Sequence, residues 1–229
     1  MRVAVADDDP EILDQIAGSL EKSAHKCDRF SNGQDLMVAL KRDTYDIVLL
    51  DWNMPKATGL DVMAWAKEAL DHPPAFILMT SRSGKADVVR GLKLGASDYI
   101  IKPESDEVVQ ARIEAAGRGI GHSSESRHVT YGDYAIDRLE KTIALKGETP
   151  KLTAREFKVA SLFFENLNRP LSRNYIFLQV WGDTIDLETR TLDMHVSRIR
   201  SKLALRPENG FAIQTVFGFG YRMDSFAGS

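Results

Sequence analysis

Four short apolar runs in the first half of the chain each end in a polar side chain. Asp7 and Asp8 follow the first run, Asp51 the second, Thr80 the third and Lys102 the fourth. Runs of this kind are typical of buried parallel strands. Because ligands of an open α/β sheet bind just beyond the carboxyl ends of its strands, we expect these five side chains to converge in one pocket.

The segments between and after these runs include stretches with the spacing of amphipathic helices. Apolar residues recur with helical periodicity in the ranges 12–20, 36–40, 60–70, 88–94 and 108–116. Regular alternation of strands and helices predicts an α/β fold with a doubly wound parallel sheet over residues 1–118.

The chain changes character after this region. Residues 119–127 are rich in glycine and serine and lack apolar periodicity, which predicts a flexible linker. In residues 128–226 strand-like runs come first, helical runs follow from Thr153, and two strands around a glycine turn come last. We therefore expect a second, α+β domain over residues 128–226.

The two halves differ in charge. Residues 1–118 carry 15 Lys and Arg against 20 Asp and Glu, a net charge of −5, and residues 119–229 carry 15 against 13, a net charge of +2. The second half is not strongly basic, so any contact with nucleic acid has to come from a local patch. No apolar run approaches the ~20 residues that cross a bilayer, and the single cysteine fits a reducing compartment. We expect a cytoplasmic protein with no membrane partner.

Three carboxylates in one pocket repel each other unless a cation lies between them. Mg²⁺ removes the conflict, because it prefers oxygen ligands and retains water, which leaves room for a phosphate oxygen. It would also offset the charge of a phosphoryl group transferred to a carboxylate nucleophile. Lys102 would then pair with one phosphate oxygen and Thr80 would donate a hydrogen bond to another. Each acidic residue alone is explained as well by a loop or a helix cap, as Asp9 before Pro10 is.

The pocket residues belong to longer motifs: Asp7-Asp8, residues 50–55 with Gly59, Thr80, and residues 99–103. Through these motifs residues 1–118 resemble the receiver domain of bacterial two-component response regulators. The resemblance implies a flavodoxin-like sheet of five strands in the order 2-1-3-4-5. It also implies that Asp51 accepts a phosphoryl group from a sensor histidine kinase. Mg²⁺ would be bound by Asp8, Asp51 and the backbone carbonyl of Asn53, with Asp7 acting largely through water.

The same resemblance implies a switch and a dimer face. Thr80 and Tyr99 would form the switch pair, which alters the face made by the fourth helix, fifth strand and fifth helix. Asp98 and Arg112 match charged positions of that face, so the resemblance implies a homodimer on activation. The peptide bond before Pro103 is expected to be cis.

A helix expected over residues 190–204 has two unlike faces. Its apolar residues Leu192, Val196, Ile199 and Leu203 lie at offsets of 4, 3 and 4, on one side. The opposite side is polar and basic and is made by Arg190, Met194, Ser197, Arg198 and Ser201, with Arg200 at its margin. Such a helix fits the major groove of B-DNA. On charge alone it is equally well a solvated face.

Several spaced motifs in the second half agree in their order: residues 152–157, 171–173, 180–182, 190–203 and 215–222. With them, residues 129–223 resemble the winged helix-turn-helix domain of the OmpR/PhoB family. The resemblance implies that the helix over 190–204 enters the major groove of promoter DNA. Base contacts are expected from Arg198 and Met194, phosphate contacts from Arg173, Arg190 and Arg200, and a phosphate contact or a packed ring from His195.

Two further regions gain a meaning from this resemblance. Many relatives have an arginine that reaches into the minor groove where this chain has Phe217. Packing in the core, stacking on sugar and wedging at a base step all stay open for Phe217. The loop over residues 182–188 is expected, by analogy, to contact RNA polymerase.

Three functions compete at this point. The first is a two-component response regulator in which phosphorylation of Asp51 promotes dimerisation and sequence-specific DNA binding. The second is a phosphatase with a phosphoaspartyl intermediate. Those enzymes carry a carboxylate two residues after the nucleophile, where this chain has Asn53, so we expect no enzyme and at most slow autodephosphorylation. The third is a DNA-binding regulator that dimerises without phosphate. Two departures from the family pattern favour it: Glu104, where the family usually has Phe, and Phe217. The intact acidic pocket opposes it.

Overall fold

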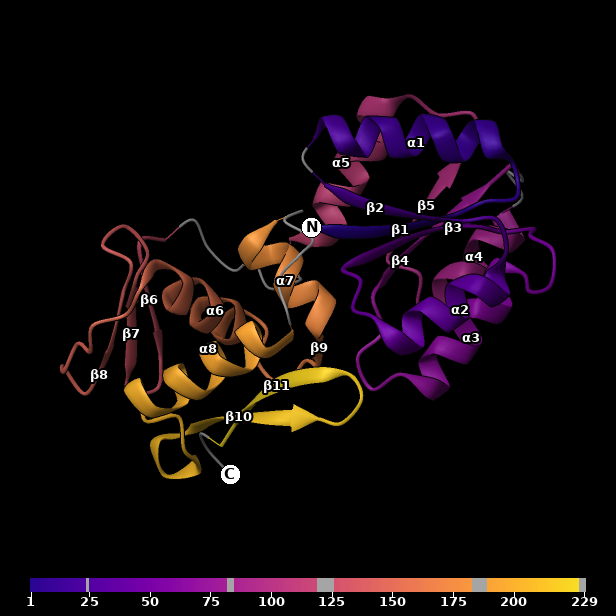
Figure 1. The fold of residues 1–229 in the computed structure, drawn as a ribbon. Coiled ribbons are helices and arrows are strands. Elements are labelled where there is room, and N and C mark those ends of the chain that lie inside the picture. Colours follow the sequence, from indigo (N-terminus) through magenta and orange to yellow (C-terminus); the bar gives the residue numbers. More distant parts are fainter. Residues whose placement is uncertain (24, 82–84, 119–125, 183–188, 227–229) are drawn as a thin grey trace. The chain divides into compact units, whose positions relative to one another are not determined.

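The computed structural model describes residues 1–23, 25–81, 85–118, 126–182 and 189–226, with the backbone alone at 85–88 and 189–190 (Figure 1). The chain divides into two compact units, Met1–Ile120 and Gly121–Ser229.

Strands and helices alternate through the first unit. The strands are β1 (Arg2–Ala6), β2 (Lys26–Phe30), β3 (Ile47–Asp51), β4 (Ala75–Thr80) and β5 (Asp98–Ile101). The helices are α1 (Pro10–Lys22), α2 (Gly33–Arg42), α3 (Gly59–Ala69), α4 (Lys85–Leu94) and α5 (Asp106–Gly117). The strands pair in parallel in the order β2-β1-β3-β4-β5. The predicted doubly wound sheet and its strand order are confirmed.

The sheet is covered on both faces, which explains why its strands are continuous apolar runs. Every residue of β1 and β3 is buried. Helices α1 and α5 cover one face and α2 and α3 lie on the other (Figure 1), each over its own cluster of buried apolar side chains. Full burial of each such side chain stabilises the fold by about 1.5–3 kcal/mol.

Local hydrogen bonds fix where the helices begin. The Asp9 side chain accepts a hydrogen bond from the backbone N–H of Glu11 at 2.9 Å and Pro10 opens α1, as predicted. Thr58 and Asp61 form a capping box at the start of α3. These caps fix the residues at which the chain begins to return along the sheet as α1 and α3.

The strand register brings the expected site residues to one edge. Asp51 lies opposite Met79, and Thr80 opposite Ile101, so β3, β4 and β5 end side by side. The Lys102-Pro103 peptide bond that follows β5 is cis, as expected.

The second unit is a mixed α+β fold. Its strands are β6 (His128–Tyr131), β7 (Tyr134–Asp137), β8 (Thr142–Leu145), β9 (Leu171–Ser172), β10 (Phe211–Val216) and β11 (Gly220–Ser225). Its helices are α6 (Ala154–Glu165), α7 (Arg173–Trp181), α8 (Thr189–Lys202) and the 3₁₀ helix η1 (Pro207–Asn209). The opening antiparallel sheet β6-β7-β8 and the closing hairpin β10-β11 confirm the prediction. The two-residue strand β9, which pairs with β11, was not predicted.

The core of the second unit is rich in aromatic rings. Tyr134, Phe164 and Phe211 pack together with ring centroids 5.2 to 5.7 Å apart. The four apolar residues that were predicted to share one helix face are all fully buried, three of them on α8 and Leu203 directly after its last residue. The predicted start of the helical runs at Thr153 is confirmed, since Thr153 and Glu156 form a capping box at the start of α6.

The boundary between the two predicted domains falls largely outside the described residues. Helix α5 ends at Gly117 and strand β6 begins at His128. Of the expected linker over 119–127, only Ser126 and Arg127 are described, and the linker stays a prediction.

Candidate functional site

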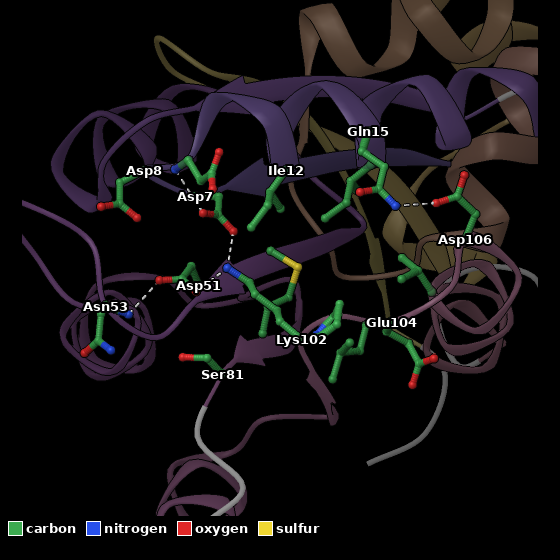
Figure 2. Close-up of a pocket in the computed structure, with 16 residues that line it drawn as sticks. Asp7, Asp8, Ile12, Gln15, Asp51, Asn53, Ser81, Lys102, Glu104 and Asp106 are labelled. Carbon is green, nitrogen blue, oxygen red and sulfur yellow. Dashed lines mark hydrogen bonds and ion pairs between the residues drawn. The ribbon is translucent and has the colours of Figure 1, made fainter.

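A cavity of about 590 Å³ opens at the carboxyl ends of the parallel strands (Figure 2). Its lining combines charged and polar groups with buried apolar residues that include Ile16, Met79 and Val109. Among the expected site residues, its lining contains Asp7, Asp8, Asp51, Asn53 and Lys102.

Three carboxylates gather in this cavity. Asp7, Asp8 and Asp51 each offer an oxygen atom, and these atoms all lie within 4.8 Å of one another. Asp7 and Asp51 are buried and Asp8 is exposed. A set of hard oxygen donors with one side open to water fits a magnesium ion, which keeps part of its hydration shell.

Lys102 reaches into the carboxylate cluster from the end of β5. Its Nζ lies 2.5 Å from Oδ1 of Asp51 and also donates a hydrogen bond to the carboxylate of Asp7 (Figure 2). Burial works to lower the pKa of Lys102, but its hydrogen bonds to Asp51 and Asp7 outweigh burial and raise that pKa. The lysine is therefore held as a cation beside the carboxylates.

Asp51 is a buried carboxylate with defined partners. Burial raises the pKa of Asp51, and the hydrogen bonds from Lys102 and from the backbone N–H of Asn53 oppose the rise. The N–H of Asn53 donates to Oδ2 of Asp51 at 2.8 Å. One oxygen of the carboxylate thus faces Lys102, while the other is oriented by the loop after β3.

The expected switch residues lie beside the cavity rather than in its lining. Thr80 is buried at the end of β4, and Tyr99 is half-buried on β5. Ser81, the residue after Thr80, lines the cavity instead (Figure 2).

Sequence reasoning missed several residues at the cavity mouth. Gln15 on α1 donates from Nε2 to Oδ1 of Asp106 on α5 at 3.1 Å, and Glu104 lies on the loop between β5 and α5 (Figure 2). No local signal marks a contact across 91 positions. Ser81 could have been found, because it follows Thr80 at a strand end that already carried an expected site residue.

The two expected residues of the dimer face contact each other within the chain. Arg112 on α5 and Asp98 on β5 form an ion pair at 2.7 Å. Val89, Leu92 and Ile101 expose apolar surface on α4 and β5.

The polar face of α8 carries three of the expected DNA contacts. Met194, Ser197 and Arg198 are exposed. His195 is half-buried, since its Nδ1 lies 2.7 Å from the carbonyl oxygen of Thr191 and its ring packs edge-on against Trp181. The side chain of Arg190 lies outside the described residues.

Two expected phosphate contacts are engaged inside the unit. Arg173 forms an ion pair with Asp193 at 2.7 Å. Arg200 donates from Nη2 and Nε to the carbonyl oxygen of Ile213, at 2.7 and 3.1 Å. Both guanidinium groups also lie over the ring of Tyr221.

Asp193 and Tyr221 are functional candidates that sequence reasoning did not single out. The hydroxyl of Tyr221 donates a hydrogen bond to the carboxylate of Asp193, which ties β11 to α8. Both residues stood in the motifs of the second half, but nothing in their spacing indicated that they would meet.

Phe217 is fully exposed at the turn between β10 and β11. Packing of this side chain in the core, which the sequence left open, is therefore excluded. Its exposure follows from the turn, because the hairpin strands end on either side of it.

Comparison with known proteins agrees with this division. Residues 3–114 match the family model of the response regulator receiver domain. Residues 147–223 match the model described as transcriptional regulatory protein, C terminal. The two units therefore define a regulator with a receiver domain and a DNA-binding output domain.

Similarity to individual proteins extends over nearly the whole chain. Sensory transduction protein RegX3 of Mycobacterium tuberculosis is 32% identical over 97% of this chain and 98% of its own length. The phosphate regulon transcriptional regulatory protein PhoB of Pseudomonas aeruginosa is 29% identical, with 97% of each chain covered. The response regulator DrrB of Thermotoga maritima, an OmpR/PhoB homologue of known structure, aligns over 98% of this chain and 99% of its own, with 27% identity and a TM-score of 0.47.

The chain belongs to the two-component response regulators of the OmpR/PhoB type. Within the part of the chain that the structure describes, no helix combines the length and apolarity needed to cross a membrane.

Proposed function

We propose that this chain is a phosphorylation-controlled transcription regulator whose phosphoacceptor is Asp51. The observation that carries the proposal is the geometry around that residue: two further carboxylates within 4.8 Å and the ammonium of Lys102 at 2.5 Å. A lone carboxylate at a strand end has no such surroundings.

The reaction follows from the same groups. An oxygen of Asp51 attacks the phosphorus of a phosphohistidine on a sensor histidine kinase. The P–N bond breaks, its electron pair returns to the imidazole, and an acyl phosphate forms on Asp51. Lys102 is close enough to pair with a phosphate oxygen once Asp51 has been phosphorylated.

Asp8, Asp51 and the backbone carbonyl of Asn53 are the groups that would hold Mg²⁺, with Asp7 acting mostly through water. The bound ion supplies positive charge to the phosphoryl oxygens. We propose no catalytic turnover beyond slow autodephosphorylation, because Asn53 lies where a second carboxylate would be needed to activate water.

The downstream steps are part of the same proposal. The phosphoryl group shifts Thr80 and Tyr99, and two receivers pair through the face that contains Asp98 and Arg112. When two receiver domains (residues 1–118) pair, binding of one DNA-binding domain to its half-site raises the effective concentration of the second domain at the adjacent half-site.

The proposed DNA-contacting residues differ in whether their side chains already form bonds inside the domain. Arg198 and Met194 are the base readers, since both are exposed on α8, with Ser197 beside them. Arg173, Arg200 and His195 reach phosphate only by giving up or sharing internal contacts. Arg190, whose side chain lies outside the described residues, is the fourth proposed phosphate contact. The loop proposed to contact RNA polymerase, residues 182–188, lies outside the described residues except for Gly182.

The test of the proposal is the intact mass of the full chain after incubation with acetyl phosphate and Mg²⁺. We expect one added phosphoryl group on the wild type, and none on Asp51→Asn or when Mg²⁺ is omitted. Asp71→Asn, which changes an exposed aspartate of the same unit, is the matched control and should be phosphorylated normally. A phosphoryl group that persists on Asp51→Asn would refute the assignment.

A second measurement separates the proposal from a regulator that dimerises without phosphate. In the proposed mechanism, acetyl phosphate increases dimerisation and DNA affinity of the wild type and leaves Asp51→Asn unchanged. Equal dimerisation of both proteins, with and without the donor, would support the phosphate-independent alternative.

A further inference from the structure

The cavity beside Asp51 is larger than the proposed phosphorylation requires. Its volume is about 590 Å³. A phosphoryl group and a partly hydrated Mg²⁺ amount to about six groups of the size of water, or about 180 Å³ at about 30 Å³ per water. Protein interiors are otherwise close-packed, with few voids larger than a water molecule. The cavity therefore has room for a second occupant beside the phosphorylation site.

Much of the lining that phosphorylation does not use is apolar. Two helices and two strands contribute to it: Ile12 and Ile16 on α1, Met79 on β4, Ile100 on β5 and Val109 on α5. All except Ile12 are buried members of the apolar cluster on this face of the sheet, and Ile12 packs against that cluster. Binding pockets for small molecules combine apolar walls of this kind with a few polar groups that orient the ligand.

The polar groups on the α5 side of the cavity are acidic. Glu104 is exposed on the loop between β5 and α5, and Asp106 is half-buried at the first residue of α5. Figure 2 shows both, together with Gln15, on the side of the cavity away from Asp8 and Asn53. They therefore form a second polar region, separate from the carboxylates proposed to hold Mg²⁺.

Both of these carboxylates can accept further hydrogen bonds. Oδ1 of Asp106 accepts from Gln15 at 3.1 Å, and Oε1 of Glu104 accepts from the backbone N–H of Ser105 at 3.0 Å. An ionised carboxylate offers about four acceptor sites, so each keeps capacity for a donor from a ligand. Within the part of the chain that the structure describes, no lysine or arginine forms an ion pair with Glu104 or Asp106.

The charge of the lining selects the sign of the ligand. Among the described residues that line the cavity, six carboxylates face one ammonium, that of Lys102. Lys102 is already paired with Asp7 and Asp51. A bound Mg²⁺ offsets part of this charge, but the lining stays negative with the ion in place. Charge complementarity therefore favours a cationic ligand and disfavours an anionic one.

We propose that this cavity binds a small amine with an aromatic body, whose ring packs against Ile12, Met79 and Val109 and whose ammonium pairs with Glu104 and Asp106. A phenyl ring supplies a rigid apolar body for such walls. The proposal goes beyond phosphorylation and does not depend on it, because these five side chains have no part in the proposed transfer to Asp51.

The experiment measures binding of phenethylamine to the full chain by isothermal titration calorimetry, at neutral pH and in saturating Mg²⁺. We expect a Kd of about 0.1–1 mM, which is the range for a ligand of this size. 2-Phenylethanol has the same ring without the charge and should bind about tenfold more weakly. Phenylacetate, which carries the opposite charge, and ethylamine, which lacks the ring, should show no binding.

Variants of the lining separate the two halves of the site. Glu104→Gln combined with Asp106→Asn should weaken binding of phenethylamine about tenfold and leave binding of 2-phenylethanol unchanged. Glu107→Gln, which changes an exposed carboxylate of α5 outside the lining, is the matched control and should bind as the wild type does. Val109→Phe adds a ring to the cavity and should abolish binding of both probes, with a thermal melt to show that the variant is folded. If Val109→Phe does not fold, the comparison of the acidic variants decides.

Three outcomes would overturn the proposal: no binding of phenethylamine to the wild type, equal binding to the wild type and to the variant that lacks both carboxylates, or binding that is seen only without Mg²⁺. The last would place the ammonium among Asp7, Asp8 and Asp51 instead. Phosphorylation by acetyl phosphate is followed separately by intact mass. If the wild type is phosphorylated but binds no amine, the proposed function stands and only the amine site fails; if it binds the amine but is not phosphorylated, the reverse holds.

Discussion

Removing the ammonium of Lys102 is the sharpest perturbation of the carboxylate cluster. Lys102→Met keeps a long side chain but leaves Asp7 and Asp51 without their shared cation. Removing one partner from a buried ion pair destabilises proteins by about 3–5 kcal/mol. The Lys102 side chain retains 17% exposure, so water screens part of the loss, and we expect about 3 kcal/mol at neutral pH.

The expected pH dependence follows from Asp51. Burial already raises the pKa of this carboxyl, and loss of Lys102 removes the main opposing contact. A carboxyl group whose pKa is higher in the folded than in the unfolded state destabilises the fold once it is ionised. The cost of Lys102→Met should therefore be largest at neutral pH and should shrink as the pH falls through the raised pKa.

The measurement is urea unfolding followed by tryptophan fluorescence in a Trp181→Phe background. The two tryptophans that then remain, Trp52 and Trp65, both belong to the first unit. Lys67→Met, which changes an exposed lysine on α3, is the control and should shift stability by less than about 0.5 kcal/mol.

A double variant completes the test. Asp51→Asn added to Lys102→Met removes one of the unpaired charges and should recover about 1 kcal/mol or more as coupling energy. The reasoning is refuted if Lys102→Met is as stable as the Lys67→Met control, or if its cost grows as the pH is lowered.

Three further predictions concern other parts of the chain. The hydrogen bond from Arg127, followed by those from the backbone N–H groups of Glu140 and Leu139, lowers the pKa of Asp137 to about 2. The contribution of this carboxylate to stability is present above its unfolded-state pKa and is lost as the pH falls toward 2. Arg127→Ala should raise the pKa of Asp137 in an NMR titration of the carboxyl carbon. Arg198→Ala should weaken specific DNA binding by about 1–3 kcal/mol and leave the melting temperature unchanged. Arg200→Ala should lower the melting temperature, because the guanidinium of Arg200 donates to the carbonyl oxygen of Ile213. An unchanged melting temperature for Arg200→Ala would contradict a structural role of this arginine. Gly59→Ala would bring a Cβ too close to the backbone carbonyl oxygen of Asp51. We expect this variant to lose about 1–3 kcal/mol of unfolding free energy and to be phosphorylated more slowly. Wild-type stability of the variant would count against this close approach.

The sequence predicted the first unit well because its signals are local. Each buried strand is a continuous apolar run, and each run ends at the residue that the pocket needs. A parallel register then places those ends together, so that the meeting of Asp7, Asp51 and Lys102 follows from strand positions alone.

Contacts between distant residues were not predictable in the same way. Gln15 and Asp106 meet because α1 and α5 cover the same face, and neither residue has a local pattern that marks the pairing. Strand β9 was missed because two residues are too few for a period of two to be seen, and its pairing with Tyr221 and Gly220 depends on tertiary structure.

The role of individual arginines was equally hidden. The family resemblance implied a base contact for Arg198 and phosphate contacts for Arg173 and Arg200, without indicating which of these side chains form bonds inside the domain. Only the structure separates the exposed Arg198 from Arg173 and Arg200, whose donors are engaged by Asp193 and by the carbonyl of Ile213. The amino-acid sequence does not show in which direction each of these arginine side chains points.

The link between Tyr221, Asp193 and Arg173 has a thermodynamic consequence for recognition. It joins the hairpin, α8 and the start of α7 through side-chain bonds that exist before any nucleic acid arrives. Rotational freedom that a loosely attached helix would lose on association is then already lost in the free domain. Less of the gross interaction energy is consumed in ordering the domain, and discrimination between DNA sequences depends more directly on how well each one fits a surface of fixed shape.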